Sequence, residues 1–366
     1  MATRNTPILL LKTGIIASSL FLMACGGSSS SDEGALPPDD SNGNPVTLPV
    51  PEPEVPVDDG LINVDGEVFS NLTEAQAAIK AGSLVVFGKG VYSQGLYIGH
   101  DDVTVQGSTG THFKEATIQG KATFVVSGDD VSIEGIECSG VSVPDENGAC
   151  VRQQGRDLTL SHVYFHDSEQ GVLSSTGTGK LTIEYSTFDK LGKAGQAHAV
   201  YSQNDSLEIR YSKFYSSKDQ GHEIKSRAAE TLIEYSEIAS LSGVDSRLVD
   251  VPNGGKLTIR DSVLEQGPNT SNYQLVGYGL EGMKDSYSHT IVLENNIVLM
   301  ERVNGNVFLG LPSDASGIDI SITSNDFIGR KFNDQGEHDI EAKNDLYLDR
   351  PSYGLGPFPE LPSIGL

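Results

Sequence analysis

The chain is short of positive charge. Only 25 of its 366 residues are Lys or Arg, against 50 Asp and Glu, which gives a formal net charge of -25. Because binding to a phosphate backbone draws on Lys and Arg, this balance argues against a nucleic-acid partner. An acidic surface also repels anionic glycans at long range, but salt screens charges more than about 10 Å apart. A local basic patch would therefore still allow a glycan to bind.

Long apolar runs and several common catalytic motifs are also missing. The apolar run from Ile15 to Met23 is too short to span a bilayer. No Gly-x-Ser-x-Gly segment, nucleotide-binding loop or paired-cysteine metal motif is present. The sequence thus offers no support for a nucleophile-elbow hydrolase, a P-loop enzyme or a zinc ribbon.

The first 24 residues have the features of a signal peptide. Arg4 and Lys12 precede the apolar run, which ends in Leu-Met-Ala before Cys25. The segment Leu-Met-Ala-Cys-Gly resembles the lipobox of bacterial lipoproteins, in which Cys25 would become the acylated first residue; an ordinary secretory signal is the alternative. In that pattern an Asp after the cysteine retains proteins at the inner membrane, and here the residue is Gly26. We therefore expect an outer-membrane lipoprotein, at the periplasmic face or the cell surface.

Residues 25–60 are expected to form a tether. From Gly26 to Gly60 there is no Lys or Arg, and seven residues are Pro. Such a segment cannot bury enough apolar surface to offset its ordering entropy, and proline stiffens it. Residues 61–366 could hold one large domain or two ordinary ones. The repeat described next favours one.

A repeat runs through this region. Its anchors are apolar residues in alternating, strand-like segments: Ile133, Leu160, Ile183, Ile209, Ile233, Ile259, Leu293 and Ile322. The steps between them are 27, 23, 26, 24, 26, 34 and 29 residues. We interpret them as a constant coil with loops of variable length.

Two further positions recur with the last six anchors. Three residues after each anchor stands a small polar residue: Ser186, Ser212, Ser236, Ser262, Asn296 and Asn325. Five residues after it stands an apolar one: Phe188, Phe214, Ile238, Leu264, Val298 and Phe327. Stacked coils would let the polar side chains form hydrogen bonds along the turn while the apolar ones fill the core. A helical solenoid lacks this alternation, and a leucine-rich repeat would need a different leucine and Asn spacing.

A capping helix precedes the coils. We expect it at Leu72–Gly82, with Thr73 and Gln76 at capping-box spacing, because the end of a solenoid needs a cap. The helix, the apolar segments of Ser83–Gly107 and the coils that follow resemble right-handed parallel β-helix proteins of the pectate-lyase-like superfamily. The resemblance covers about Leu61–Gly329. It implies an all-β, right-handed parallel β-helix.

The candidate site lies on adjacent coils. Gln196–Tyr201 matches Gln220–Arg227 with a shift of 24 residues, which places His198 near His222 and Tyr201 near Lys225. Because residues two apart on a strand share a face, we expect Tyr201, Glu223, Lys225 and Arg227 to point outward together. The next two coils add further candidates for substrate binding: Arg247, Asp250, Asn253, Tyr278 and Glu281.

These residue types suit β-elimination on a uronic-acid polysaccharide, which needs carboxylate neutralisation, a base for the C5 proton and an acid for the leaving oxygen. Arg227 suits the first role, because its planar fork holds carboxylates. Lys225 could be the base if nearby positive charge lowers its pKa, and Tyr201, His198 or His222 could protonate the leaving group. Superfamily lyases often place Lys and Arg on adjacent coils, some with calcium held by acids, whereas here both lie on one strand. The resemblance therefore implies a polysaccharide lyase and leaves Ca2+ open as a cofactor.

Other functions share these residues. A uronan C5-epimerase also begins with C5 proton abstraction, and a glycoside hydrolase could use paired acids among Glu223, Asp245 and Asp250. A glycan-binding or structural lipoprotein would use the polar wall without catalysis. In that case the histidines would be satisfied by backbone groups, the charges would form a solvated ion-pair row, and Asn253–Gly255 would be a turn.

Metal and cysteine chemistry is sparse. We find no convincing metal set; the nearest is His162, His166 and Asp167. Cys138 and Cys150 would lie in an oxidising compartment, where they could form a disulfide or remain a buried free pair. We expect a monomer that binds an acidic polysaccharide.

Overall fold

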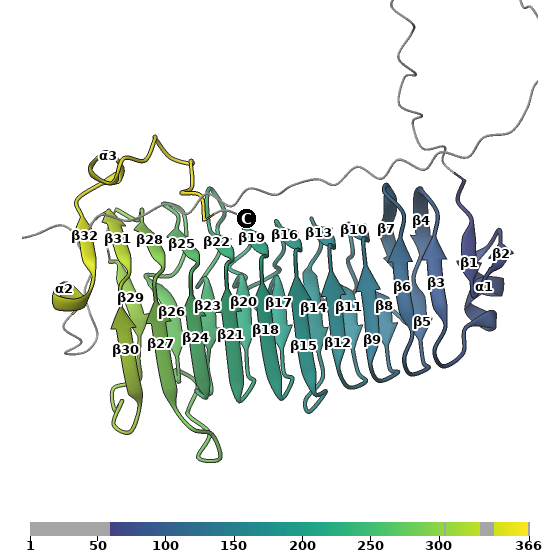
Figure 1. The fold of residues 1–366 in the computed structure, drawn as a ribbon, viewed down its shortest axis with the longest axis horizontal. Helices are drawn as coiled ribbons and strands as arrows, with labels where there is room; N and C mark the ends of the chain where they lie inside the picture. Colours follow the sequence, from purple (N-terminus) through teal and green to yellow (C-terminus); the bar gives the residue numbers. More distant parts are fainter. Residues whose placement is uncertain (1–58, 304, 330–339, 365–366) are drawn as a thin grey trace, which may run out of the picture. The chain divides into compact units, whose positions relative to one another are not determined.

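The computed structural model describes residues 59–303, 305–329 and 340–364. They form a parallel β-solenoid of three sheets that run the length of the coil (Figure 1), which confirms the predicted all-β coil. Among these residues no helix is long and apolar enough to cross a membrane. The signal peptide, Cys25 and most of the tether lie outside the described residues.

From β3 to β31, successive strands go to sheets A, B and C in turn. Sheet A holds β2 (Glu67–Phe69), β1 (Ile62–Val64), β3 (Leu84–Phe87), β6 (Thr104–Gly107), β9 (Val131–Glu134), β12 (Leu158–Ser161), β15 (Lys180–Glu184), β18 (Ser206–Arg210), β21 (Glu230–Glu234), β24 (Lys256–Arg260), β27 (Thr290–Glu294) and β30 (Asp319–Thr323). Sheet B holds β4 (Gly90–Gln94), β7 (Thr111–Thr117), β10 (Glu137–Ser139), β13 (Tyr164–His166), β16 (Thr187–Asp189), β19 (Lys213–Tyr215), β22 (Glu237–Ala239), β25 (Val263–Gln266), β28 (Ile297–Met300), β31 (Asp326–Gly329) and β32 (Asp345–Tyr347). Sheet C holds β5 (Leu96–Ile98), β8 (Ala122–Val126), β11 (Ala149–Gln153), β14 (Gln170–Ser174), β17 (Val200–Ser202), β20 (Ile224–Ser226), β23 (Val249–Val251), β26 (Gln274–Tyr278) and β29 (Val307–Gly310).

The predicted anchors stack in register inside the coil. On sheet A, Ile183 pairs with Ile209, and the row continues through Ile233 to the later anchors. On sheet B, Phe188 pairs with Phe214, and their rings stack with centroids 4.7 Å apart. Both rows are buried, so the core is a set of parallel side-chain stacks.

The turn from sheet A to sheet B explains the recurring Ser and Asn. The residue before each of them has a positive φ, which bends the chain sharply: Tyr185, Tyr211, Tyr235, Asp261, Asn295 and Ser324. The following Ser or Asn accepts a hydrogen bond from a backbone N–H of the preceding coil, as Ser212 Oγ does from Ser186 (3.2 Å) and Asn325 Oδ1 from Asn296 (2.9 Å). We call this row the Ser/Asn ladder, and it confirms the predicted stacking along the turn.

The N-terminal cap contains the helix α1 (Leu72–Ala78). Its N-cap is Asn71, whose side chain accepts from the backbone N–H of Glu74 (2.9 Å). The predicted capping box of Thr73 and Gln76 is wrong, because the helix begins one residue before Thr73; Gln76 instead accepts from the backbone N–H of Tyr97 (3.0 Å). The helix therefore closes the first coil with both its apolar face and Gln76.

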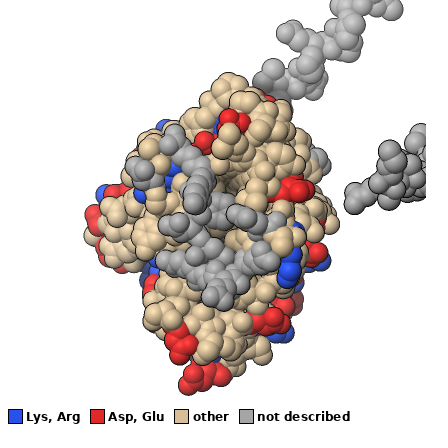
Figure 2. All heavy atoms as spheres, turned by 90° about the vertical axis from the view of Figure 1, so that its left-hand side faces the viewer, with Lys and Arg blue, Asp and Glu red and all other residues tan. Residues whose placement is uncertain are grey.

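The C-terminal segment also packs on the coil, a point that the sequence left open. It contains α2 (Ile340–Lys343), β32 beside β31, and α3 (Arg350–Tyr353). Leu355, Leu361 and Ile364 cover apolar residues on the outside of sheet B. Seen from this end, acidic and basic side chains lie mainly around the rim of the described surface (Figure 2).

Cys138 and Cys150 form a disulfide, with Cα atoms 6.0 Å apart. It joins β10 to β11, and both residues belong to the buried core. Of the two alternatives from the sequence, the paired form is therefore correct. The bond closes the loop between sheets B and C in one coil.

Buried carboxyl groups line the passage from sheet B to sheet C. Glu223 is fully buried and accepts from the backbone N–H (2.6 Å) and the hydroxyl (2.7 Å) of Ser217. Burial raises the pKa of Asp245 to about 7 and that of Glu265 to about 8. These two acids therefore keep protons in the folded chain that they lose near pH 4 when unfolded.

The Ser/Asn ladder predicts that the protein becomes less stable when one of its side chains is removed. Ser236 Oγ accepts from the Ser212 N–H (3.2 Å) and donates to the Glu234 carbonyl (2.8 Å). Ser236→Ala leaves that buried N–H without an acceptor, so we expect the free energy of unfolding in urea to fall by about 1–3 kcal/mol. Ser132→Ala, on the half-exposed outer face of β9, is the control; equal losses in the two variants would contradict a structural role for the ladder.

The buried acids predict a pH dependence. Their folded pKa values are raised, so the folded state binds more protons than the unfolded state between about pH 4 and pH 8. The free energy of unfolding should therefore fall as the pH rises through this window. In the Asp245→Asn, Glu265→Gln double variant this part of the decline should vanish. An unchanged pH profile of urea unfolding in the double variant would refute the assignment.

Candidate functional site

The outer face of sheet C and the segments next to its strands carry a row of polar and charged side chains, which we call the wall: Tyr201, Lys225, Arg227, Arg247, Asp250 and Glu281. Tyr201, Lys225 and Asp250 are paired in register on β17, β20 and β23. Their neighbours Val200 and Ile224 point into the core. The predicted approach of Tyr201 to Lys225 is thus confirmed.

A single carboxylate bridges the two central cations. Lys225 Nζ lies 2.8 Å from Glu281 Oε1, and Arg227 Nη2 lies 2.5 Å from Glu281 Oε2. The Lys225 side chain is 11% exposed, whereas that of Glu281 is 45% exposed. The two cations therefore form a partly buried seat that accepts a carboxylate approaching from solvent.

Arg227 is fixed by three neighbours. Besides Glu281, its Nε donates to the Tyr201 hydroxyl oxygen (2.8 Å) and its Nη1 donates to Asn253 Oδ1 (2.6 Å). Burial works against the charged form of Arg227, but hydrogen bonds to Tyr201 and Glu281 outweigh it and raise its pKa. The guanidinium is thus a preorganised cation with a phenol beside it.

Glu281 comes from the long loop between β26 and β27. The loop is tied down by hydrogen bonds from Glu281 N to the Pro252 carbonyl (3.0 Å) and from the Tyr287 hydroxyl to the Arg227 carbonyl (3.3 Å). Burial alone would raise the pKa of Glu281, but Lys225 and Arg227 hold it below its usual value. The loop accounts for the 34-residue step in the repeat and supplies the carboxylate that occupies the seat.

A second group of charges extends the wall. Arg247 donates to Asp250 Oδ1 (3.2 Å) from Nη1 and to Gln274 Oε1 from Nη2 (2.6 Å). Asp250 is only 1% exposed, and its Oδ2 lies 3.5 Å from Lys225 Nζ without a hydrogen-bond partner among the described residues. Asp250 therefore links the two basic groups electrostatically.

The two histidines lie beneath the wall. Their ring centroids lie 4.8 Å apart, with the rings tilted by 34°, and the repeat predicted this proximity. Each Nδ1 accepts a backbone N–H of the next coil, His198 from His222 (3.1 Å) and His222 from Arg247 (3.0 Å). Burial lowers the pKa of His222 to about 4 and that of His198 well below its ordinary value. Both are therefore neutral at pH 7, with the proton on Nε2, which fits support of the backbone better than general acid catalysis.

Three predicted substrate-binding residues are buried: Asp250, described above, and also Glu223 and Tyr278. Glu223 was expected to point outward, but it precedes the first residue of β20, where the strand alternation does not yet apply, and its side chain bonds to Ser217. Tyr278 is fully buried and donates to the Gly255 carbonyl (2.5 Å). Neither side chain can reach a polymer on the wall.

Asn253 has a positioning role. Its Oδ1 accepts from Arg227, and its Nδ2 donates to the Gly282 carbonyl (3.0 Å). Gly254 and Gly255 both have positive φ, as a turn requires. The turn thus holds both Arg227 and the Glu281 loop. Sequence reasoning missed Gln274 and Tyr287 as wall contacts, although the enlarged step between anchors pointed to the segment that carries Tyr287.

The metal candidates from the sequence are separated. His162 stacks on Tyr185, with centroids 5.2 Å apart. His166 instead lies beside Glu137 and Asp167, at 3.1 Å and 2.8 Å. His162 thus drops out of the set, and His166 gains a carboxylate from the preceding coil.

No protein-family model and no curated protein sequence matches the chain. Among solved structures, it is similar to PfbA, a surface adhesin of Streptococcus pneumoniae, with 12% identity, a TM-score of 0.43, and coverage of 76% of this chain and 86% of that one. An alginate lyase from Paenibacillus sp. str. FPU-7 has 11% identity and a TM-score of 0.38, over 75% and 94% of the two chains. The tailspike gp49 of Acinetobacter baumannii bacteriophage Fri1, a capsular polysaccharide depolymerase, has 12% identity and a TM-score of 0.25, over 70% and 58%. At these identities the similarity concerns the solenoid fold alone.

Proposed function

We propose that the wall binds an acidic polysaccharide and cleaves it by β-elimination. The observation that carries the proposal is the seat of Lys225 and Arg227, which holds the Glu281 carboxylate at 2.8 Å and 2.5 Å. A uronate carboxylate has the same chemistry and would take the place of Glu281. The loop carboxylate then acts as a displaceable stand-in for the substrate.

The remaining roles follow from the contacts. Arg227 and Lys225 neutralise the uronate carboxylate, which acidifies the C5 proton. The Tyr201 oxygen accepts a hydrogen bond from Arg227 Nε, and its ring centroid lies 5.8 Å from Lys225 Nζ, so we assign Tyr201 as the base. Lys225, which contacts Asp250 and Glu281, is assigned to donate the proton to the leaving oxygen. This reverses the role that the sequence suggested for Lys225.

The shape of the wall suits a polymer. Consecutive strands are about 4.8 Å apart, so the wall extends across the coils from Tyr201 on β17 to Asp250 on β23, and Gln274 on β26 lies next to it. Arg247 and Gln274 offer further polar contacts beside the seat. The wall contains three cations and two carboxylates, which gives it a local positive balance on a chain of net charge -25. Binding should therefore weaken as salt screens these charges.

Removing either cation of the seat tests whether the wall cleaves the polysaccharide. Lys225→Ala and Arg227→Ala in the full chain should each lower product formation on the right uronan by at least about 100-fold, as general acid–base and charge-stabilising groups do. The assay is ultraviolet absorbance of the unsaturated product, with alginate, pectate, glucuronan and glycosaminoglycans as substrates. Lys213→Ala on sheet B and Arg210→Ala on sheet A are matched controls that remove ion-paired cations elsewhere.

Full activity in both seat variants would refute the lyase assignment. Solvent deuterium incorporation at C5 without unsaturated product would identify an epimerase instead. Binding that depends on the seat, with neither reaction, would identify a glycan-binding protein.

Glu281→Gln tests the displaceable carboxylate. Removing the competing charge should tighten polyuronate binding on the order of tenfold, about 1.4 kcal/mol, measured by calorimetry at fixed ionic strength. Asp285→Asn, on the same exposed loop, makes the same change in net charge and is the control. If both variants bind equally, long-range charge and not the seat governs affinity.

A further inference from the structure

We propose a binding site for a divalent transition-metal ion, with Zn2+ as the preferred occupant, formed by His112, Glu137 and His166. The three residues come from β7, β10 and β13, adjacent strands of sheet B. The site lies apart from the wall, which is on sheet C, and it does not depend on the proposed function.

The donor atoms are spaced as a metal ion requires. Glu137 Oε1 lies 3.1 Å from His166 Nε2 and 3.6 Å from His112 Nδ1, and all three atoms lie within 4.8 Å of one another. With metal–ligand bonds of about 2.0–2.2 Å, tetrahedral donors stand about 3.3–3.6 Å apart. If the distance between His112 Nδ1 and His166 Nε2 shortens slightly, the three donor atoms occupy three corners of a tetrahedron.

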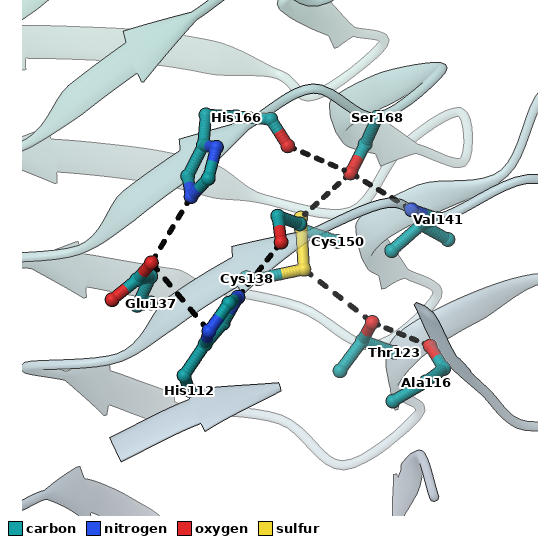
Figure 3. The surroundings of a disulfide bond; sticks show 10 residues. His112, Ala116, Thr123, Glu137, Cys138, Val141, Cys150, His166 and Ser168 are labelled. Atoms are coloured by element: carbon teal, nitrogen blue, oxygen red, sulfur yellow. Dashed lines mark hydrogen bonds and ion pairs between the residues drawn. A yellow bond between two sulfur atoms is a disulfide. The ribbon is translucent and has the colours of Figure 1, made fainter. Parts of the chain in front are cut away.

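Both rings approach the same carboxylate oxygen, His112 from the preceding strand and His166 from the following strand (Figure 3). Without a metal, each ring would need a proton on the nitrogen facing Glu137 to make a favourable contact. A single dication replaces both protons and satisfies all three donors. The arrangement therefore suits a metal ion better than a pair of separate ion pairs.

The outward contacts of the rings support this reading. His166 Nδ1 lies 2.8 Å from Asp167 Oδ2, and His112 Nε2 lies 2.7 Å from Ser139 Oγ. Metal-binding histidines commonly donate their other N–H to such a partner, which fixes the tautomer and the ring orientation. In both residues the nitrogen that faces Glu137 is the one left for the metal.

The support for the ligands is rigid. Tyr164 stacks on the His166 ring with centroids 4.3 Å apart. Next to Glu137, Cys138 forms the disulfide with Cys150 and is buried in the core (Figure 3). The strand that carries the central ligand is thus held by a covalent bond beneath it.

The ligand types select the metal. Two imidazoles and one carboxylate suit Zn2+ and other late divalent ions, whereas Ca2+ and Mg2+ prefer oxygen ligands. The side chains of all three residues are partly exposed, so a fourth position remains open to water. An ion bound here would cross-link three consecutive coils.

The test uses the full chain, without a polyhistidine tag and freed of metal with a chelator. Calorimetry should show one tight Zn2+ site per chain, and Co2+ should give the visible absorption of a tetrahedral nitrogen and oxygen site. Ca2+ should not compete. Zn2+ should also raise the thermal midpoint, because a ligand that binds only the folded state stabilises it.

Glu137→Gln and His166→Gln should each weaken Zn2+ binding at least tenfold and abolish the Co2+ spectrum. His162→Gln removes a nearby histidine outside the cluster and should leave both unchanged. Circular dichroism verifies that each variant is folded. Absence of a stoichiometric site, or equal binding by wild type and Glu137→Gln, would overturn the proposal.

Discussion

The coil is held in register by one repeated interaction, the hydrogen bond from a backbone N–H of one coil to the Ser or Asn side chain of the next. Ser186 to Ser212 and Asn296 to Asn325 are examples. The ladder requires the sharp bend made by the left-handed residue before it. Because each buried N–H without an acceptor costs about 1–3 kcal/mol, a slip of one residue would be expensive along the whole row. The core stacks of these coils, such as Phe188 on Phe214, share this register.

Because the register is fixed, residues of the same kind lie next to one another in successive coils. This stacks aromatic rings, but it also brings like charges close together. The exposed rings of Tyr185, Tyr211 and Tyr235 stack 5.0 to 5.2 Å apart. On the wall, the same rule places Lys225 beside Tyr201. Arg227 follows just after the end of β20, so the two cations lie close together and need neighbouring carboxylates. Glu281, delivered by a loop, provides the one that a ligand can replace, whereas Asp250 is buried within the wall. The carboxylate that a ligand can replace, Glu281, thus comes from a loop, whereas the buried carboxylate, Asp250, comes from a strand.

Stacking also accounts for the polar residues that are not available for binding. His198 and His222 use Nδ1 to satisfy backbone N–H groups between coils. Glu223 satisfies Ser217 in the passage between sheets. In a solenoid the backbone leaves its sheets at every corner, and buried side chains must complete the hydrogen bonding there. A polar residue near the end of a strand can therefore serve to complete the backbone hydrogen bonding and not to bind a ligand.

The sequence by itself determined the coil, its core rows, the Ser/Asn ladder and the pairing of Tyr201 with Lys225, because these features repeat with the period of the coil. It could not give the direction of Glu223, which lies just outside a strand, where alternation fails. Nor could it reveal that Glu281 folds back onto Lys225 and Arg227, since a loop has no period. The pairing of Cys138 with Cys150, and the meeting of His112 and Glu137 with His166, were also decided by tertiary structure. His112 is paired in register with Glu137, whereas His166 is paired with Ser139, two residues further along the same strand. Loops of variable length hide this register in the sequence, and only the folded coil shows it.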